Sequence, residues 1–139
     1  MSGKHPILMI YYTYNMDENF DTLVAEASHI LENQENYQWS LGELANNVVQ
    51  SYGYKALEDF AKKIQETSGV WRSPGSLRMY AFVWRQSVKL GIPKDLLFST
   101  CQAIVFSDNP QKYIDMAGTG ASRVDIRNQI YTDKHNAGN

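Results

Sequence analysis

Cysteine and histidine are scarce in this sequence of 139 residues, which has one cysteine and three histidines. The single Cys101 excludes an intrachain disulfide and any thiolate metal cluster. His5, His29 and His135 are far apart, and neither an H-x-x-x-H nor a C-x-x-C spacing occurs. We therefore expect no bound metal and no cofactor, and a buried, inert thiol at Cys101.

Long hydrophobic runs are also missing. The longest run, residues 7–14, falls well short of the ~20 apolar residues that span a bilayer. It ends in tyrosines, and no small-residue cleavage site follows it. We expect a cytoplasmic protein with no membrane partner.

Patterns typical of catalysis are missing too. No serine lies in a nucleophile-elbow setting. The acidic pairs at 17–18 and 58–59 are adjacent in sequence, so on a helix their side chains diverge by ~100°. We expect no enzymatic activity and no small-molecule substrate.

Acidic residues are concentrated in the first part of the chain. Residues 1–37 contain one lysine and six Asp or Glu, which gives a charge of −5. Residues 76–139 contain eight basic and five acidic residues, which gives +3, and residues 68–94 contain no acidic residue at all. The overall charge of −2 therefore conceals a dipolar molecule, and such asymmetry is a hint of polyanion binding.

Apolar residues at helical spacing predict a mainly α-helical bundle. Residues 7–14 are apolar on both faces and open two alternatives, a short N-terminal β-strand or a continuous N-terminal helix. The expected helices cover residues 17–33, 40–53, 54–67, 74–90, 94–106, 110–117 and 122–133.

Three helix starts have local signatures. Ser40 with Glu43, and Ser122 with Asp125, have the spacing of a capping box. Ser73 before a proline is typical of a capped helix start, because proline loses no hydrogen bond in the first turn.

We expect three parts along the chain. Residues 1–37 form an N-terminal arm and helix that carries dimerisation, residues 38–134 form a DNA-binding domain, and residues 135–139 form a disordered polar tail.

Residues 54–90 supply the parts of a helix-turn-helix, which needs a first helix, a short break and a second, exposed helix. A helical wheel of residues 74–90 places an apolar arc toward the core, namely Leu77, Tyr80, Ala81, Trp84 and Val88. A second arc faces outward and contains Arg78, Arg85 and Lys89, flanked by Phe82 and Gln86. This arc contains no acidic residue, whereas ordinary solvated faces mix both signs, so we interpret it as a DNA-contacting face. The alternative is a solvated basic face that binds nothing.

Within this face the residues have different expected roles. Arg72, Ser73 and Ser76 lie at the helix start, where free N–H groups and the positive dipole end can hold a phosphate. An arginine on the face can fork onto a guanine edge, while Lys89 suits the DNA backbone.

Residues 112–131 repeat the pattern of a helix-turn-helix on a smaller scale. A short helix, a Gly-Thr-Gly break and a capped helix bearing Arg123 and Arg127 repeat the arrangement. Asp115 and Asp125 dilute its charge, so the alternative is a packing or partner surface.

The order of several motifs resembles a known class. The chain resembles the helix-turn-helix of DNA-binding regulators of bacterial plasmids, phages and mobile elements, a class of regulators related to the plasmid partition proteins. The motifs that carry the resemblance are W-S-L-G-E-L at residues 39–44, Y-G at 52–53, Ser73, and L-R at 77–78. The same order of motifs is also similar to the N-terminal helical domain of certain restriction-like nucleases, but nothing of the nuclease domain is present. The resemblance implies that residues 73–89 form the recognition helix, with Ser76, Arg78 and Met79 near bases.

These patterns together predict a sequence-specific double-stranded DNA-binding protein, a transcriptional or mobile-element regulator that acts as a homodimer. Two symmetric copies can read two half-sites, whereas one recognition helix makes few contacts. The alternative is a non-enzymatic helical adaptor whose acidic and basic parts dock onto partner proteins.

Overall fold

The chain is helical throughout the part that the structure describes. The computed structural model describes the backbone of residues 8–33, 37–93 and 96–137, and the side chains of these ranges from residue 18 on, except those of Asn33 and Ala137. The helices in these ranges are α1 (Leu8–Asn33), α2 (Tyr37–Tyr52), α3 (Ala56–Ser68), α4 (Pro74–Leu90), α5 (Phe98–Val105), α6 (Pro110–Gly118) and α7 (Arg123–Ala137). The mainly α-helical fold class is therefore confirmed.

The N-terminal alternative is decided in favour of the helix. Residues 8–14 belong to α1, so the expectation of a strand there is wrong; Ile7 lies outside the described residues. A helix satisfies its own backbone hydrogen bonds, whereas a single strand leaves its N–H and C=O groups unpaired. At the other end α7 continues to Ala137, beyond the predicted end at residue 133 and into the expected tail.

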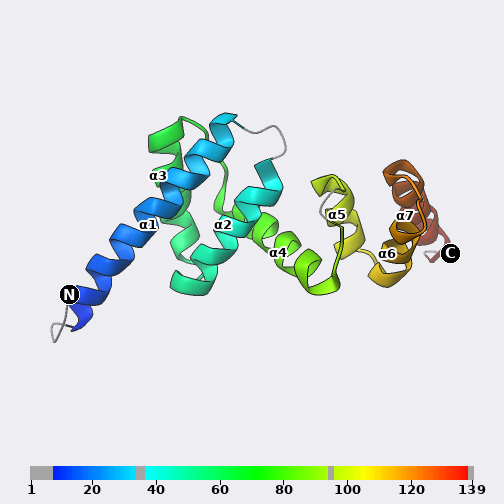
Figure 1. Cartoon of the computed structure of the whole chain (residues 1–139), viewed down its shortest axis with the longest axis horizontal. Helices are drawn as coiled ribbons and strands as arrows, with labels where there is room; N and C mark the ends of the chain where they lie inside the picture. Colours follow the sequence, from blue (N-terminus) through cyan, green and yellow to red (C-terminus); the bar gives the residue numbers. More distant parts are fainter. Residues whose placement is uncertain (1–7, 34–36, 94–95, 138–139) are drawn as a thin grey trace.

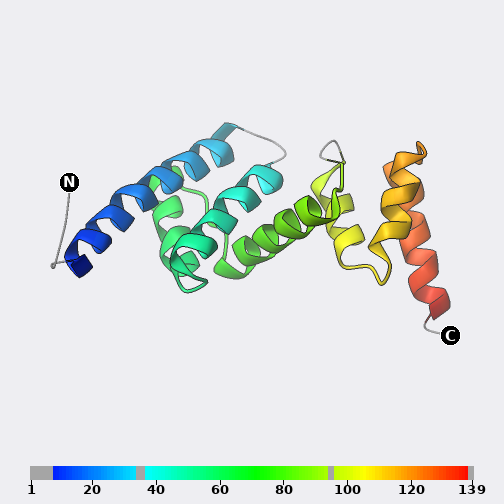
Figure 2. The same cartoon turned by 60° about the horizontal axis from the view of Figure 1, so that its bottom comes forward.

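The molecule is elongated, with its two ends far apart (Figures 1 and 2). Helices α1–α4 pack together at one end, and α5–α7 form a smaller group at the other. The most extensive contact between two helices joins α2 and α4, and α4 also contacts α3 and α5. Helix α4 thus packs within the first group and connects it to the second through α5.

Helices α2 and α4 approach each other closely at Gly42. An added Cβ at this position would lie 2.5 Å from the backbone oxygen of Tyr80 and 3.1 Å from Cβ of Trp84. Only glycine permits this backbone-to-backbone contact.

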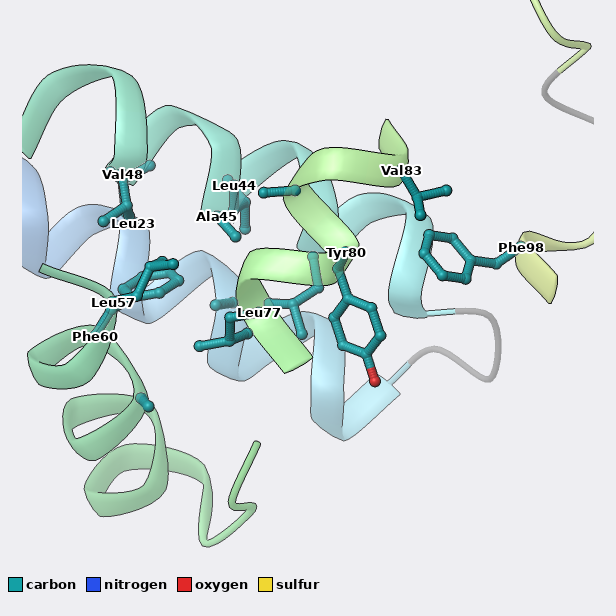
Figure 3. Close-up of a cluster of buried hydrophobic side chains, with 14 of the residues drawn as sticks. Leu23, Leu44, Ala45, Val48, Leu57, Phe60, Leu77, Tyr80, Val83 and Phe98 are labelled. Atoms are coloured by element: carbon teal, nitrogen blue, oxygen red, sulfur yellow. The ribbon is translucent and has the colours of Figure 1, made fainter. Parts of the chain in front are cut away.

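The buried side of α4 differs from the helical wheel. Leu77, Tyr80 and Ala81 are buried as predicted, but Val88 is 50% exposed, while Val83 and Ser87 are buried instead. The cause is α5: Figure 3 shows Phe98 pointing toward Val83 and Tyr80, and the Tyr80 and Phe98 rings meet edge to face at 5.5 Å. Packing against α5 as well as α2 rotates the buried arc away from Val88. The wheel's placement of Val88 in the core is therefore wrong, and Trp84 is only half-buried.

Two of the three predicted helix starts are confirmed. The Ser73 side chain accepts a hydrogen bond from the Ser76 N–H at 3.1 Å, and Pro74 opens α4. Ser122 and Asp125 form the reciprocal bonds of a capping box at 3.3 and 3.1 Å. The predicted start at Ser40 is wrong, because α2 begins at Tyr37 and Ser40 lies inside it.

The connection between α3 and α4 is short, and its first residue caps the end of α3. Gly69 has a φ of 79° and caps α3 through its N–H, which donates to the Gln65 carbonyl. This left-handed conformation favours glycine at a helix end. Five residues, 69–73, then lead from α3 to α4.

Within the described ranges, no helix is both long and apolar enough to cross a bilayer.

Candidate nucleic-acid interface

One side of α4 carries its basic residues and is only partly covered by neighbouring segments. Arg78 and Lys89 are exposed on this side. The remaining candidate residues of α4 are half-buried, namely Ser76, Met79, Phe82, Arg85 and Gln86. Arg78 and Lys89 thus face outward as the helical wheel predicts, whereas Arg85 is half-buried. We call this side, from Ser76 to Lys89, the basic face of α4.

Arg78 is held by an aromatic ring. Its guanidinium lies 4.3 Å from the ring centroid of Tyr54, which is 43% exposed and belongs to the connection between α2 and α3. A guanidinium stacked on a ring keeps its N–H donors in the plane, where they can still fork onto another group. Tyr54 was not recognised in the sequence, where it appears only as the residue after a helix-ending glycine.

Arg85 is held by a neutral amide. Its Nη1 donates to Oδ1 of Asn46 at 2.9 Å, and its guanidinium lies 5.7 Å from the centroid of Phe82. Asn46 belongs to α2 and is only 7% exposed. The amide orients the guanidinium without cancelling its charge. Nothing in the sequence marks Asn46, because its role depends on the contact between α2 and α4.

The basic face has no acidic counterpart among the described residues. The ion pairs among the described residues join Lys63 to Asp21 at 3.7 Å and Lys112 to Asp133 at 2.7 Å, and neither involves α4. An unpaired cluster of like charge creates a positive potential that attracts polyanions.

Arg72 has its donors engaged within the protein. Its Nε and Nη2 donate to Oη of Tyr37 at 3.1 and 2.8 Å, and its Nη1 donates to the Trp71 carbonyl at 2.9 Å. The guanidinium also lies 4.8 Å from the Tyr37 ring centroid. Burial raises the pKa of the neighbouring Tyr80 above its ordinary value, and a hydrogen bond with Tyr37 adds to the rise. Arg72 therefore joins the loop before α4 to the start of α2, which positions α4.

The start of α4 is occupied by its own cap. Ser73 Oγ accepts from the Ser76 N–H and donates to Ser76 Oγ at 3.1 Å. A phosphate at this helix terminus would share these groups with the cap.

The structure does not bring Arg123 and Arg127 to the basic face. Both are exposed on α7, which packs against α5 and α6 at the far end of the molecule (Figure 1). Arg127 Nη1 lies 3.4 Å from Oγ of Ser99 on α5. Any DNA contact by α7 would therefore form a second surface, separate from α4.

Phe106 adjoins the basic face and was missed in the sequence. Its ring stacks on that of Phe82 with the centroids 5.6 Å apart and an interplanar angle of 23°. Phe106 is 57% exposed and directly follows α5. An aromatic residue at a helix end carries no signal of such a contact, because the partner ring lies 24 positions earlier.

Comparisons with known proteins add no family: no protein-family model, no curated protein and no solved structure matches this chain. In the described part of the chain, no three His, Cys, Asp or Glu side chains gather where they could hold a metal ion.

Proposed function

We propose that this chain is a non-enzymatic, sequence-specific double-stranded DNA-binding protein, a regulator of transcription or of a mobile element. The observation that carries the proposal is the basic face of α4, which is exposed at Arg78 and Lys89, half-buried at Arg85, and has no carboxylate partner among the described residues. Such a face suits a groove lined by phosphates.

In this proposal α3, residues 69–73 and α4 act as a helix-turn-helix. Helix α4 enters the major groove, and α2 supports it from behind along the contact at Gly42. The motif order that resembles partition-protein-like regulators supports the same assignment.

The residues of the face divide by chemistry. Arg78 and Arg85 are oriented by Tyr54 and Asn46, so each can present a fork to a guanine edge. Lys89, a point charge near the end of α4, contacts the DNA backbone.

We also propose that two copies act together, with residues 1–37 forming the dimer contact. Within these residues the structure describes the backbone of α1, whose first turns extend past the other helices (Figure 2). Size-exclusion chromatography should show a dimer that becomes a monomer when residues 1–14 are removed. A full-length monomer would refute dimerisation, and an unchanged dimer would refute its placement.

The DNA proposal is tested by selecting bound duplexes from a random library and then measuring affinity against salt. We expect log affinity to fall linearly with log salt, by about 0.9 per phosphate contacted. Arg78→Ala should weaken binding to the selected site by roughly 5–150-fold and relax base preference at one position. Lys89→Ala should weaken all sequences alike and flatten the salt slope by about one.

Lys62→Ala provides the matched control, because Lys62 is exposed on α3 and lies outside the basic face. Its affinity for the selected site should stay within about twofold of the unmodified protein. Arg78→Lys keeps the charge but not the fork, so it should retain the salt slope and lose base preference. The proposal fails if no duplex is enriched, or if Lys62→Ala weakens binding as much as Arg78→Ala.

A helical adaptor is the second candidate. It is favoured by Val124 and Tyr131 on α7, which are large, apolar and well exposed, as on a surface that meets another protein. Capture of a protein partner that is lost with Tyr131→Ala, together with no shift of any duplex at low salt, would favour this function.

A further inference from the structure

Next to the basic face lies a depression that the proposed function does not use. It has a volume of about 520 Å³ and is formed by the end of α5, the loop after it, and α6 and α7. Its lining includes Phe106, Asn109, Lys112, Tyr113, Ile130 and Lys134. This volume is within the range of small-molecule sites, roughly 300–1,000 Å³.

An aromatic column connects the depression to α4. The Arg85 guanidinium lies 5.7 Å from the centroid of Phe82, and Phe82 in turn stacks on Phe106. Phe106 lines the depression and more than half of its surface is exposed. The ring is thus fixed on its Phe82 side and accessible from the depression, which makes it a platform for another flat ring.

The inner wall of the depression is fixed by hydrogen bonds. Oδ2 of Asp133 accepts from Nζ of Lys112 at 2.7 Å and from Oη of Tyr113, and Oδ1 accepts from Nε2 of Gln129 at 2.8 Å. The Lys112 hydrogen bond, followed by that of Tyr113, lowers the pKa of Asp133 to about 2. Burial, followed by the Asp133 hydrogen bond, raises the pKa of Tyr113 to about 12. The wall is therefore preformed across α6 and α7, with its carboxylate already paired.

Further polar residues also line the depression. Asp108 and Asn109 are exposed in the loop after α5, and Lys134 is exposed on α7. An amide and a carboxylate can bond the donor and acceptor edge of a base, and an ammonium group can meet a neighbouring phosphate.

We propose that this depression binds an unpaired nucleobase of the bound DNA, with the base stacked on Phe106. The inference rests on the proposed function, because the base belongs to the DNA held by α4. Stacking of a base on an aromatic side chain strengthens binding roughly 5–150-fold. Since extracting a paired base costs a comparable amount, the preferred ligand contains a base that is already unpaired.

The test compares two duplexes of the selected sequence, one fully paired and one with a single looped-out adenine beside the α4 site. The protein should bind the looped-out duplex at least tenfold more tightly. Phe106→Ala should reduce this ratio to within about twofold. The ratio is taken within each variant, so any loss of affinity for both duplexes through the Phe82 contact cancels. Phe106→Trp, which keeps a ring, should retain the preference.

Tyr131→Ala is the matched control, since it removes from α7 an exposed ring that does not line the depression. It should leave the preference unchanged. Circular dichroism melting of all variants verifies that each one folds, which we expect because Phe106 lies at the surface.

A second readout is independent of the duplex. Adenosine monophosphate titrated against the protein should shift the backbone amide signals of residues 106–109 and not those of α2, and Phe106→Ala should abolish the shifts. The inference is overturned if both duplexes bind equally, if Phe106→Ala keeps the preference, or if the nucleotide leaves these amides unshifted. In each case binding of the paired duplex through Arg78 and Arg85 would still support the proposed function, so the two failures are distinguishable.

Discussion

The crossing of α2 and α4 at Gly42 gives a quantitative test of the packing that presents the basic face. In Gly42→Ala the new methyl group would lie 2.5 Å from the Tyr80 carbonyl oxygen. A flexible side chain could rotate away from such a contact, but a backbone oxygen inside a helix cannot. The two helices must therefore separate locally, and the surrounding contacts must lengthen.

The magnitude follows from two opposing effects. Overpacking a well-packed interior costs about 1–3 kcal/mol, and the rigid contact atom places this case in the upper part of that range. Replacing glycine by alanine inside a helix recovers about 0.5–1 kcal/mol. We expect a net loss of about 1–2 kcal/mol in the free energy of unfolding and a decrease in Tm of roughly 3–10 °C.

Urea unfolding followed by far-UV circular dichroism measures this loss. Gly75→Ala is the matched control, because its methyl group would come no closer than 3.8 Å to Oγ of Ser73 in the same type of helix. It should be neutral or stabilising by up to about 1 kcal/mol. If Gly42→Ala proves as stable as Gly75→Ala, the close approach of α2 and α4 is wrong.

Three further substitutions test single contacts. The pKa of Asp133 is lowered to about 2 in the folded protein, so its stabilising effect is complete above its ordinary value of about 3.9 and disappears as the pH falls toward 2. The difference in unfolding free energy between the unmodified protein and Asp133→Asn should therefore shrink between about pH 5 and pH 2, and a pH-independent difference would contradict this. Tyr37→Phe removes the acceptor of two Arg72 donors and should destabilise the protein by about 1 kcal/mol in thermal unfolding; an unchanged Tm would show that these bonds do not stabilise the fold. Asn46→Asp places a carboxylate against Arg85, so DNA affinity should fall about tenfold while stability is retained, and unchanged affinity would count against Arg85 as a contact.

Local features of the sequence predicted much of the fold. Apolar spacing predicted the mainly helical class, and short-range chemistry predicted the cap at Ser73 and the capping box of Ser122 with Asp125. The same reasoning failed at Ser40, because a capping-box spacing also occurs inside helices. Helix α2 instead begins at Tyr37, whose hydroxyl accepts hydrogen bonds from Arg72 in the loop before α4. These two residues are 35 positions apart in the sequence, so local patterns do not predict the contact.

Long-range contacts explain what the sequence could not predict. The wheel of α4 assumed a single buried arc, whereas α2 and α5 cover two parts of its circumference, which buries Val83 and exposes Val88. The partners of the basic face, Tyr54, Asn46 and Phe106, come from three other segments. Each could be recognised only after those segments were placed beside α4.

The arginines around α4 differ in what holds them, and the difference bears on function. Arg72 uses its donors on a phenol and a carbonyl, and so joins two segments of the fold. Arg78 instead stacks on the Tyr54 ring, and Arg85 donates a hydrogen bond to the Asn46 amide. A carboxylate in either place would orient the guanidinium equally well and would add Coulombic stabilisation, but it would cancel the charge. Neutral anchors serve a side chain that must be positioned and still attract an anion. The absence of acidic residues from 68 to 94 and the neutral partners in space therefore both support the proposal that α4 contacts DNA.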